Sequence, residues 1–203
     1  MTNCRTDVLS NLEREAFRLM EEGLSSDLLY HNKEHTIRVI ESVEWLCDEE
    51  NIPDFARYLV KIAALFHDIG FVQSYDKHEE RSCEMARAVL SDFDFPKDDI
   101  ESICDLILAT KIPHHPTNIL AEIICDADLS YLGENDFYRI GGQLRQELIS
   151  YQKLEDDEAS WIQYQIRFLD AHRFFTGAYQ RLREPVKQNY MSQLRMQLKS
   201  IQK

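Results

Sequence analysis

An apolar run from Tyr58 to Phe66 is followed directly by the polar pair His67 and Asp68. The run is apolar on nearly every side of a helix, so it predicts a buried helix at the centre of the fold. Pro53 suits the first turn of this helix, and Gly70 suits its end. A buried aspartate is costly without a cation or hydrogen bonds. The pair therefore predicts either metal ligands or a capping aspartate beside a satisfied core histidine.

The rest of the chain also favours helices. Only six glycines and five prolines occur in 203 residues, which is unusual for a turn-rich β protein. Apolar residues recur with a helical period. We expect helices at about 8–23, 32–50, 53–66, 96–110, 118–132, 134–153 and 157–182, with another after residue 77 and a last one from Pro185. The predicted fold class is all-α: a single domain over residues 1–203, with a core at about 25–135 and a helical C-terminal extension at about 136–203.

Two local features refine this expectation. Asn32 is a suitable N-cap, and the helix that it begins should turn Ile37, Ile40 and Val43 inward. Residues 111–117 contain two prolines, which exclude a continuous helix and predict a loop.

Charge and composition exclude several classes of protein. The net charge of −13 argues against a general nucleic-acid binder. From Gln165 to Lys203, eight Lys or Arg residues accompany only two acids, which is typical either of a solvated surface or of one that faces an anion or a partner. No apolar run approaches the roughly 18 residues that span a bilayer, and no signal-peptide core opens the chain.

The five cysteines are odd in number and widely spaced, with no CxxC pair. This pattern favours reduced thiols in a cytoplasmic protein. We expect no membrane or nucleic-acid partner. A homodimer through the C-terminal helices stays open.

Six of the seven histidines lie between residues 31 and 115. His31 and His35 are four residues apart, so near a helix start they project from one face. Taken alone, such a pair is also typical of surface or capping histidines. His67 and Asp68 extend the set, because they should lie at the inner end of the buried helix.

Asp128 and Asp126 can be separated by helical geometry, because two positions apart means nearly opposite directions. Asp128 shares a face with apolar or aromatic residues: Ala121, Ile124 and Tyr131. We therefore predict that Asp128 points inward as a ligand. Asp126 is interpreted as solvated, or as a partner of a ligand rather than a ligand itself.

Two imidazoles and two carboxylates suit Mn, Fe, Co, Ni or Zn better than Ca, and Mg is retained as an alternative. Four protein ligands leave room on a six-coordinate ion for water and a substrate oxygen, which hydrolysis needs.

Three segments together carry a family resemblance: Tyr30-His-Asn-Lys-Glu-His-Thr36, Phe66-His-Asp-Ile-Gly70 and Cys125-Asp-Ala-Asp-Leu-Ser130. The chain resembles the HD superfamily of metal-dependent phosphohydrolases over about residues 25–135. The first and third segments look especially like those of cyclic-nucleotide phosphodiesterases. The base-recognition pocket of those enzymes has no match here, so the resemblance concerns fold and metal rather than substrate.

The resemblance implies roles for individual residues. His35, His67, Asp68 and Asp128 match the four metal ligands of the family. His31 matches the histidine that phosphodiesterases use to protonate the leaving oxygen. Independently of the resemblance, we expect Asp68 to orient or bridge the attacking water. The expected fold is thus a single HD-domain helical bundle.

Some HD proteins bind two metal ions, with extra histidines between the HD pair and the last aspartate. His78, His114 and His115 fit that order, and the alternative for each is an ordinary surface residue. If these histidines do not bind metal, they could contact phosphate, and so could Lys111 and Lys77. His172, among C-terminal aromatic residues, is interpreted as structural.

The sequence therefore predicts a divalent-metal-dependent phosphohydrolase with one or two ions. Its substrate would be a nucleotide or related small phosphate ester, cleaved as a phosphomonoester or a phosphodiester. Two alternatives remain: a di-iron HD-type oxygenase, and a non-catalytic HD-fold signalling or binding module.

Overall fold

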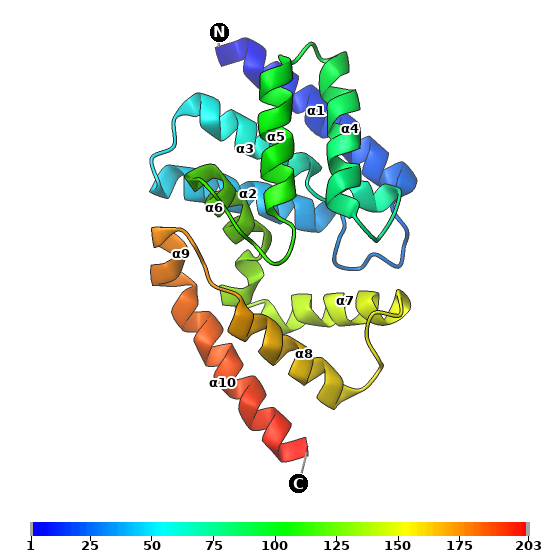
Figure 1. Ribbon diagram of the computed structural model, residues 1–203, viewed down its shortest axis with the longest axis vertical. Coiled ribbons are helices and arrows are strands. Elements are labelled where there is room, and N and C mark those ends of the chain that lie inside the picture. The colour runs from blue at the N-terminus through cyan, green and yellow to red at the C-terminus, as the bar shows by residue number, and fades with distance from the viewer. Residues whose placement is uncertain (1, 202–203) are drawn as a thin grey trace. The chain divides into compact units, whose positions relative to one another are not determined.

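The computed structural model describes residues 2–201, with side chains from residue 6 onward. The described residues form α-helices and two short 3-10 helices, and no strand occurs among them (Figure 1). The α-helices are α1 (Thr2–Gly23), α2 (Lys33–Glu49), α3 (Asp54–Phe66), α4 (His78–Asp92), α5 (Lys97–Ala109), α6 (Ile119–Asp128), α7 (Phe137–Ser150), α8 (Glu158–Ala171), α9 (Gly177–Leu182) and α10 (Glu184–Ile201). The all-α prediction is confirmed.

The chain divides into two compact units. The first holds the chain up to Ser26 together with His31–Asp128, and the second holds Asp27–Tyr30 together with the chain from Leu129 onward. The interpretation of the whole chain as one HD-type domain stays a prediction.

Helix α3 lies at the centre of the first unit. It packs against α1, α2, α4, α5 and α6. Its buried residues are Leu59, Val60, Ile62, Ala63, Ala64, Leu65 and Phe66. Because α3 is surrounded by other helices, the residues at its C-terminal end enter the interior of the unit.

Helix α2 begins as predicted but faces a different way. The Asn32 side chain accepts hydrogen bonds from the backbone N–H groups of Glu34 and His35, so it caps the helix. The prediction that Ile37 points inward is wrong, because Ile37 is 38% exposed. The buried face of α2 instead contains His35, Thr36, Val39, Val43, Leu46 and Cys47. This face turns the polar His35 inward.

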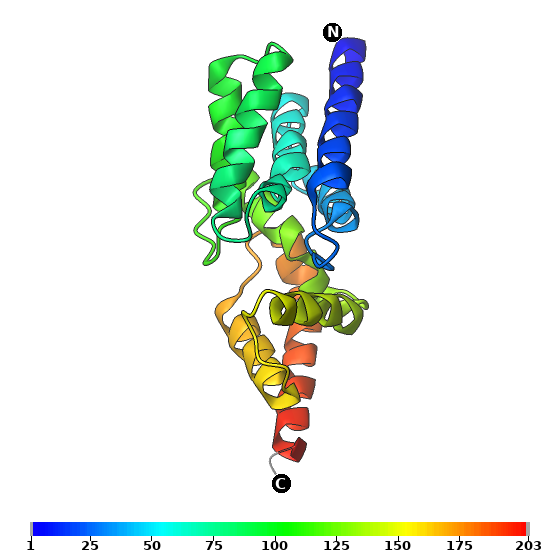
Figure 2. The ribbon, with the colours of Figure 1, turned by 90° about the vertical axis from the view of Figure 1, so that its right-hand side faces the viewer.

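A 3-10 helix, η1 (Ile69–Val72), joins α3 to the segment before α4. The Gly70 N–H donates to Ser82 Oγ of α4 at 2.9 Å. A Cβ at Gly70 would lie 2.0 Å from the His78 carbonyl oxygen and 2.6 Å from the Ser82 nitrogen. Glycine is therefore required for η1 to approach the start of α4. Figures 1 and 2 show α4 side by side with α5.

The second unit contains α7 to α10, and one predicted helix is interrupted there. The single helix predicted over 157–182 is wrong, because residues 172–176 separate α8 from α9. His172 has an extended backbone, and its carbonyl accepts a 2.6 Å hydrogen bond from the buried Lys187 amine. Thr176 then caps α9. Ending α8 supplies the acceptor that the buried lysine needs.

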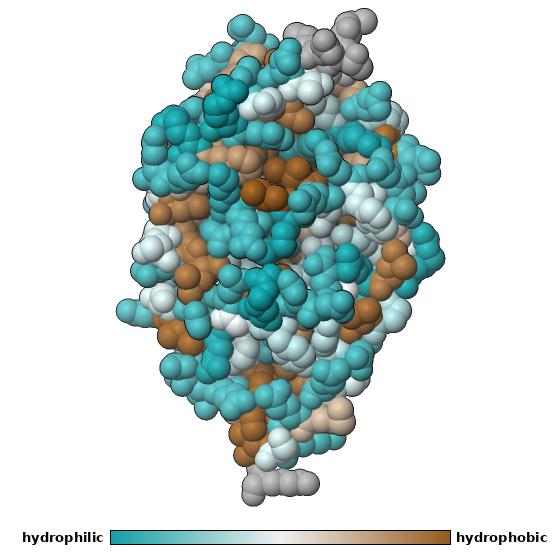
Figure 3. Space-filling view, turned by 180° about the vertical axis from the view of Figure 1, so that it is seen from behind, coloured by the Kyte–Doolittle hydropathy of each residue, from teal (hydrophilic) through white to brown (hydrophobic). Residues whose placement is uncertain are grey.

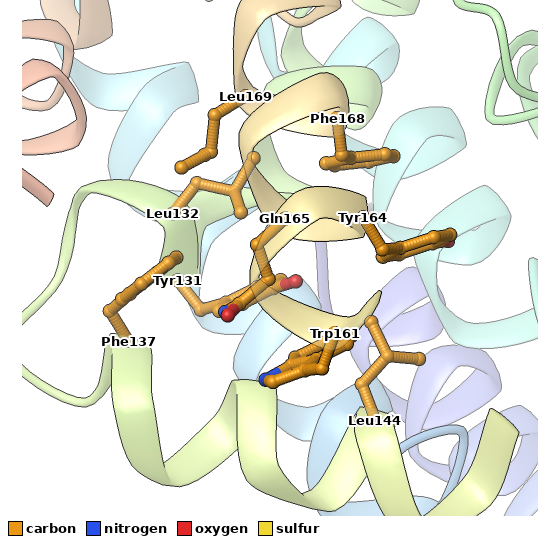
Figure 4. A pocket seen from close by; sticks show the side chains of 9 residues that line it. All are labelled: Tyr131, Leu132, Phe137, Leu144, Trp161, Tyr164, Gln165, Phe168 and Leu169. Atoms are coloured by element: carbon orange, nitrogen blue, oxygen red, sulfur yellow. The ribbon is translucent and has the colours of Figure 1, made fainter. Parts of the chain in front are cut away.

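A small cavity of about 20 Å³ lies in the second unit (Figure 4). Its lining residues come from η2 (Ser130–Gly133), α7 and α8: Tyr131, Leu132, Phe137, Leu144, Trp161, Tyr164, Gln165, Phe168 and Leu169. This volume is of the order needed for one water molecule, so the cavity is too small for a substrate.

Hydrophobic residues form separate patches among hydrophilic ones on the face that Figure 3 shows. Within residues 2–201, no helix has both the length and the apolar composition needed to cross a membrane.

We predict opposite effects for alanine at two helical glycines. Gly70→Ala should lower the free energy of unfolding by about 1–3 kcal/mol, because its Cβ would overlap backbone atoms of α4. Gly142→Ala in α7 should raise it by about 0.5–1 kcal/mol, because nothing lies within 4 Å and alanine favours a helix. Chemical denaturation of both variants measures these changes. A Gly70→Ala protein as stable as wild type would contradict the close approach of η1 and α4.

Candidate metal centre

Three chain segments deliver two histidines and two aspartates to one place in the first unit. His35 lies in the first turn of α2, where the Asn32 cap fixes the backbone. His67 and Asp68 directly follow α3. Asp128 is the last residue of α6. Each residue lies at a helix end, where side chains from different helices can converge.

The ligand atoms of these residues lie close together. His35 Nε2 is 3.2 Å from His67 Nε2 and 3.0 Å from Asp128 Oδ1. Asp68 Oδ2 is 3.1 Å from His67 Nε2 and 3.3 Å from His35 Nε2. One ligand atom from each of the four residues lies within 4.8 Å of every other. In the described part of the chain, this is the group of His, Cys, Asp and Glu side chains that could hold a metal ion.

The spacing fits a shared ion. Ligand atoms about 2.1 Å from one ion lie about 3–4 Å from their neighbours, which matches the distances between these four. Asp68 Oδ2 is buried and makes no hydrogen bond in the structure. A buried carboxylate oxygen without such a bond is unfavourable unless a cation approaches it. The donor set and the unsatisfied oxygen both fit a divalent metal.

The environment of His67 fixes which nitrogen faces the cluster. Its Nδ1 atom lies 2.8 Å from the Ala64 carbonyl oxygen, which can only accept a hydrogen bond. Nδ1 therefore carries a proton, and Nε2 is the nitrogen that faces Asp68 and Asp128. With a metal bound, Nε2 would lose its proton and offer its lone pair to the ion. A histidine that ligates a metal is commonly oriented in this way.

The electrostatics of the cluster also favour a cation. Burial lowers the pKa of His67, but the neighbouring Asp68 and Asp128 carboxylates outweigh burial and raise that pKa well above its usual value. Burial raises the pKa values of both aspartates, yet the imidazoles beside them hold these pKa values well below their usual range. Both carboxylates are thus ionised at neutral pH. A metal ion would replace protons as the balancing positive charge.

Two further predicted residues lie beside the cluster. The His31 and His35 ring centroids are 6.0 Å apart, and a positive charge on His31 would help to lower the pKa of the Asp68 carboxyl. His78 Nε2 is 3.6 Å from Asp68 Oδ1. His35 and His67 contact the other carboxylate oxygen, Oδ2. The two oxygens of Asp68 thus face different imidazoles.

The remaining predicted residues are not part of the four-residue group. His114 is half-buried, and its Nε2 lies 3.0 Å from the Thr110 carbonyl oxygen. His115 is exposed and lines a groove beside α5 and α6. Lys111 is exposed and forms an ion pair with Glu80, and Lys77 is exposed. The structure therefore brings His31 and His78 to the cluster region, but not His115.

The solvated interpretation of Asp126 is wrong, because Asp126 is completely buried. Helix α6 is buried on nearly every side, with Ala121, Ile123, Ile124, Cys125 and Ala127 also buried. Because such a helix has no polar outer face, its geometry could not predict a solvated position for Asp126. The inward placement of Asp128 holds.

Two aromatic residues of the site were not predicted from sequence. Phe71 stacks on both His31 and His78, and Tyr75 contacts Phe71 edge-on. The available signal was two aromatic residues three and seven positions after Asp68, which does not by itself indicate a contact with histidine.

The comparisons with known proteins agree with this geometry. Residues 32–130 match the HD domain family, and the match includes all three helix ends that form the cluster. The chain contains an HD domain over these residues. HD domains bind divalent metals, and the His and Asp cluster is the place in this domain that could hold one.

A similar fold occurs in the crystal structure of a predicted HD superfamily hydrolase from an uncultured Thermotogales bacterium. The TM-score is 0.53 and the sequence identity is 22%, over 77% of this chain and 91% of that chain. Comparison with curated proteins gave no match.

We predict that Asp68→Asn removes bound metal, because the amide keeps the shape of the side chain but loses its negative charge. Elemental analysis after reconstitution with Mn²⁺, Ni²⁺ or Zn²⁺ should give about one equivalent or more for wild type and far less for the variant. A metal titration should show an affinity at least about tenfold weaker for the variant. Asp98→Asn, the same change at an exposed position of α5, is the control. Equal metal content in all three proteins would contradict the site.

Proposed function

We propose that this protein is a divalent-metal-dependent phosphohydrolase that acts on a nucleotide or a related small phosphate ester. The observation that carries the proposal is the convergence of two imidazole nitrogens and two carboxylate oxygens, with His31 beside them. The neighbour of similar fold, called a predicted HD superfamily hydrolase, supports hydrolysis as the reaction class.

His35, His67, Asp68 and Asp128 would hold the metal. This mixed nitrogen and oxygen set suits Mn, Fe, Co, Ni or Zn, and Mg is retained as an alternative. When bound, a divalent ion lowers the pKa of water and neutralises negative charge on a phosphoryl group.

The chain's own side chains account for the remaining steps. Asp68 orients the attacking water by a hydrogen bond. The water oxygen forms a bond to phosphorus as the bond from phosphorus to the leaving oxygen breaks. His31, protonated on its imidazole, donates a proton to that leaving oxygen. The proton released by the water passes to solvent, so atoms and charge balance.

Whether one ion or two would bind depends on whether His78 serves as a ligand. Because Asp68 Oδ1 faces His78 while Oδ2 faces His35 and His67, the carboxylate could also contact a second ion.

A second ion makes the di-iron oxygenase the competing enzyme class. About two equivalents of iron with oxygen-dependent turnover would favour that alternative. A protein that binds metal without turnover on any substrate would favour a non-catalytic module.

We predict that His31→Ala keeps metal but loses turnover. Removal of a general acid costs about 10²–10⁴-fold in kcat when the leaving group is a poor one. The assay is release of phosphate or nucleoside from a panel of nucleoside monophosphates and phosphodiesters, with metal content measured in parallel. His115→Ala, an exposed histidine outside the four-residue group, is the control. A His31→Ala enzyme with wild-type kcat would remove the general acid from the proposal.

A further inference from the structure

One phenylalanine contacts both histidines that stand beside the candidate metal centre. The Phe71 ring stacks on His31 with centroids 4.3 Å apart and an interplanar angle of 24°. It also stacks on His78 with centroids 4.0 Å apart at 19°. His31 precedes α2 and His78 begins α4, so one side chain joins two separate elements.

The backbone of Phe71 is fixed relative to the metal ligands. Phe71 lies in η1, and its N–H donates to the Asp68 carbonyl oxygen at 3.1 Å. The preceding residue, Gly70, donates to Ser82 Oγ. The turn that carries the ring is therefore hydrogen-bonded both to the ligand residue Asp68 and to Ser82 of α4.

Neighbouring side chains hold the Phe71 ring itself. Phe71 is only 6% exposed. The Tyr75 ring meets Phe71 edge-on at 5.1 Å and 76°, and it meets His31 at 6.2 Å and 88°. Stacked and edge-on contacts both have a preferred geometry. A ring held from several sides can restrict the rotation of the imidazoles that lie against it.

We propose that Phe71 is a positioning residue: its ring holds the His31 imidazole where it can donate a proton to the leaving oxygen, and holds His78 toward Asp68 Oδ1. This inference rests on the proposed phosphohydrolase function. Misplacement of a catalytic group by about 1 Å can cost on the order of 100-fold in rate, so loss of the ring should affect turnover without removing any ligand.

The leaving group separates positioning of His31 from general damage. An alkoxide, as released from a nucleoside monophosphate, needs protonation, whereas p-nitrophenolate leaves without it. Phe71→Leu should lower kcat on alkyl esters by about 10–100-fold and on p-nitrophenyl esters by less than about threefold, with KM little changed. Phe71→Tyr keeps the ring, so its kcat on both ester types should match that of wild type. Both variants should keep the ion of the four-residue group His35, His67, Asp68 and Asp128, because Phe71 is not one of its ligands.

The matched control is Phe137→Leu, which removes another buried ring in the second unit. It should change stability without changing the ratio of the two kcat values. If Phe71→Leu does not fold, Phe71→Met provides the same test with a more adaptable side chain.

A second measurement does not depend on activity. Stacking on an aromatic ring shifts the imidazole C–H resonances of His31 and His78 upfield in the NMR spectrum of the Zn²⁺-loaded protein. These resonances, assigned with His31→Ala and His78→Ala, should move downfield in Phe71→Leu and stay in place in Phe71→Tyr. The resonance of the exposed His115 should not move in either variant.

The outcomes distinguish the two proposals. Wild-type kcat on alkyl esters in His31→Ala would remove the proposed general acid, whatever Phe71 does. A defect in His31→Ala without one in folded Phe71→Leu would overturn the positioning role. An equal loss on both ester types in Phe71→Leu, or unchanged histidine resonances, would also overturn it.

Discussion

The negative charge of Asp68 is the constraint on which the candidate site depends. The carboxylate follows a buried helix and is 7% exposed, so it requires positive charge nearby. His35 and His67 place ring nitrogens 3.3 Å and 3.1 Å from its Oδ2 atom, and Asp128 adds a second negative charge to the same space. Imidazole protons or a metal ion can balance that charge. Because the Ala64 carbonyl orients His67 through Nδ1, Nε2 is the nitrogen that faces the place where the ion would lie.

The helices of the first unit are arranged so that their ends, rather than their middles, meet at this charge. Asp128 ends α6, His67 and Asp68 follow α3, and His35 lies in the first turn of α2. Side chains at helix ends are less constrained by neighbouring turns, and the backbone there must be satisfied by caps such as Asn32. The same geometry brings η1 against α4 through Gly70. That approach also brings Phe71, with Tyr75 against it, into contact with His78 at the start of α4.

Much of this could be predicted from the chain, because helical period, caps and motifs act over short distances. The cap at Asn32, the buried α3 and the loop at 111–117 are local features, and the structure has all three. The predictions that were wrong concern features that depend on residues far away in the sequence. Ile37 is exposed because α2 turns His35 inward, and Asp126 is buried because α6 is surrounded on nearly every side. The break after Ala171 depends on the Lys187 amine, which lies 16 residues further along the chain.

The sequence by itself determined that the chain is helical, and its resemblance to the HD superfamily indicated which four residues could bind a metal. Both signals are local, because helical period and short motifs of His and Asp are carried by the residue types. Only the tertiary structure decided that His78 faces Asp68 Oδ1, that His115 lies apart, and that Phe71 touches two histidines. These relations join residues on separate elements. Their distances follow from how helices pack, which no local pattern of residues encodes.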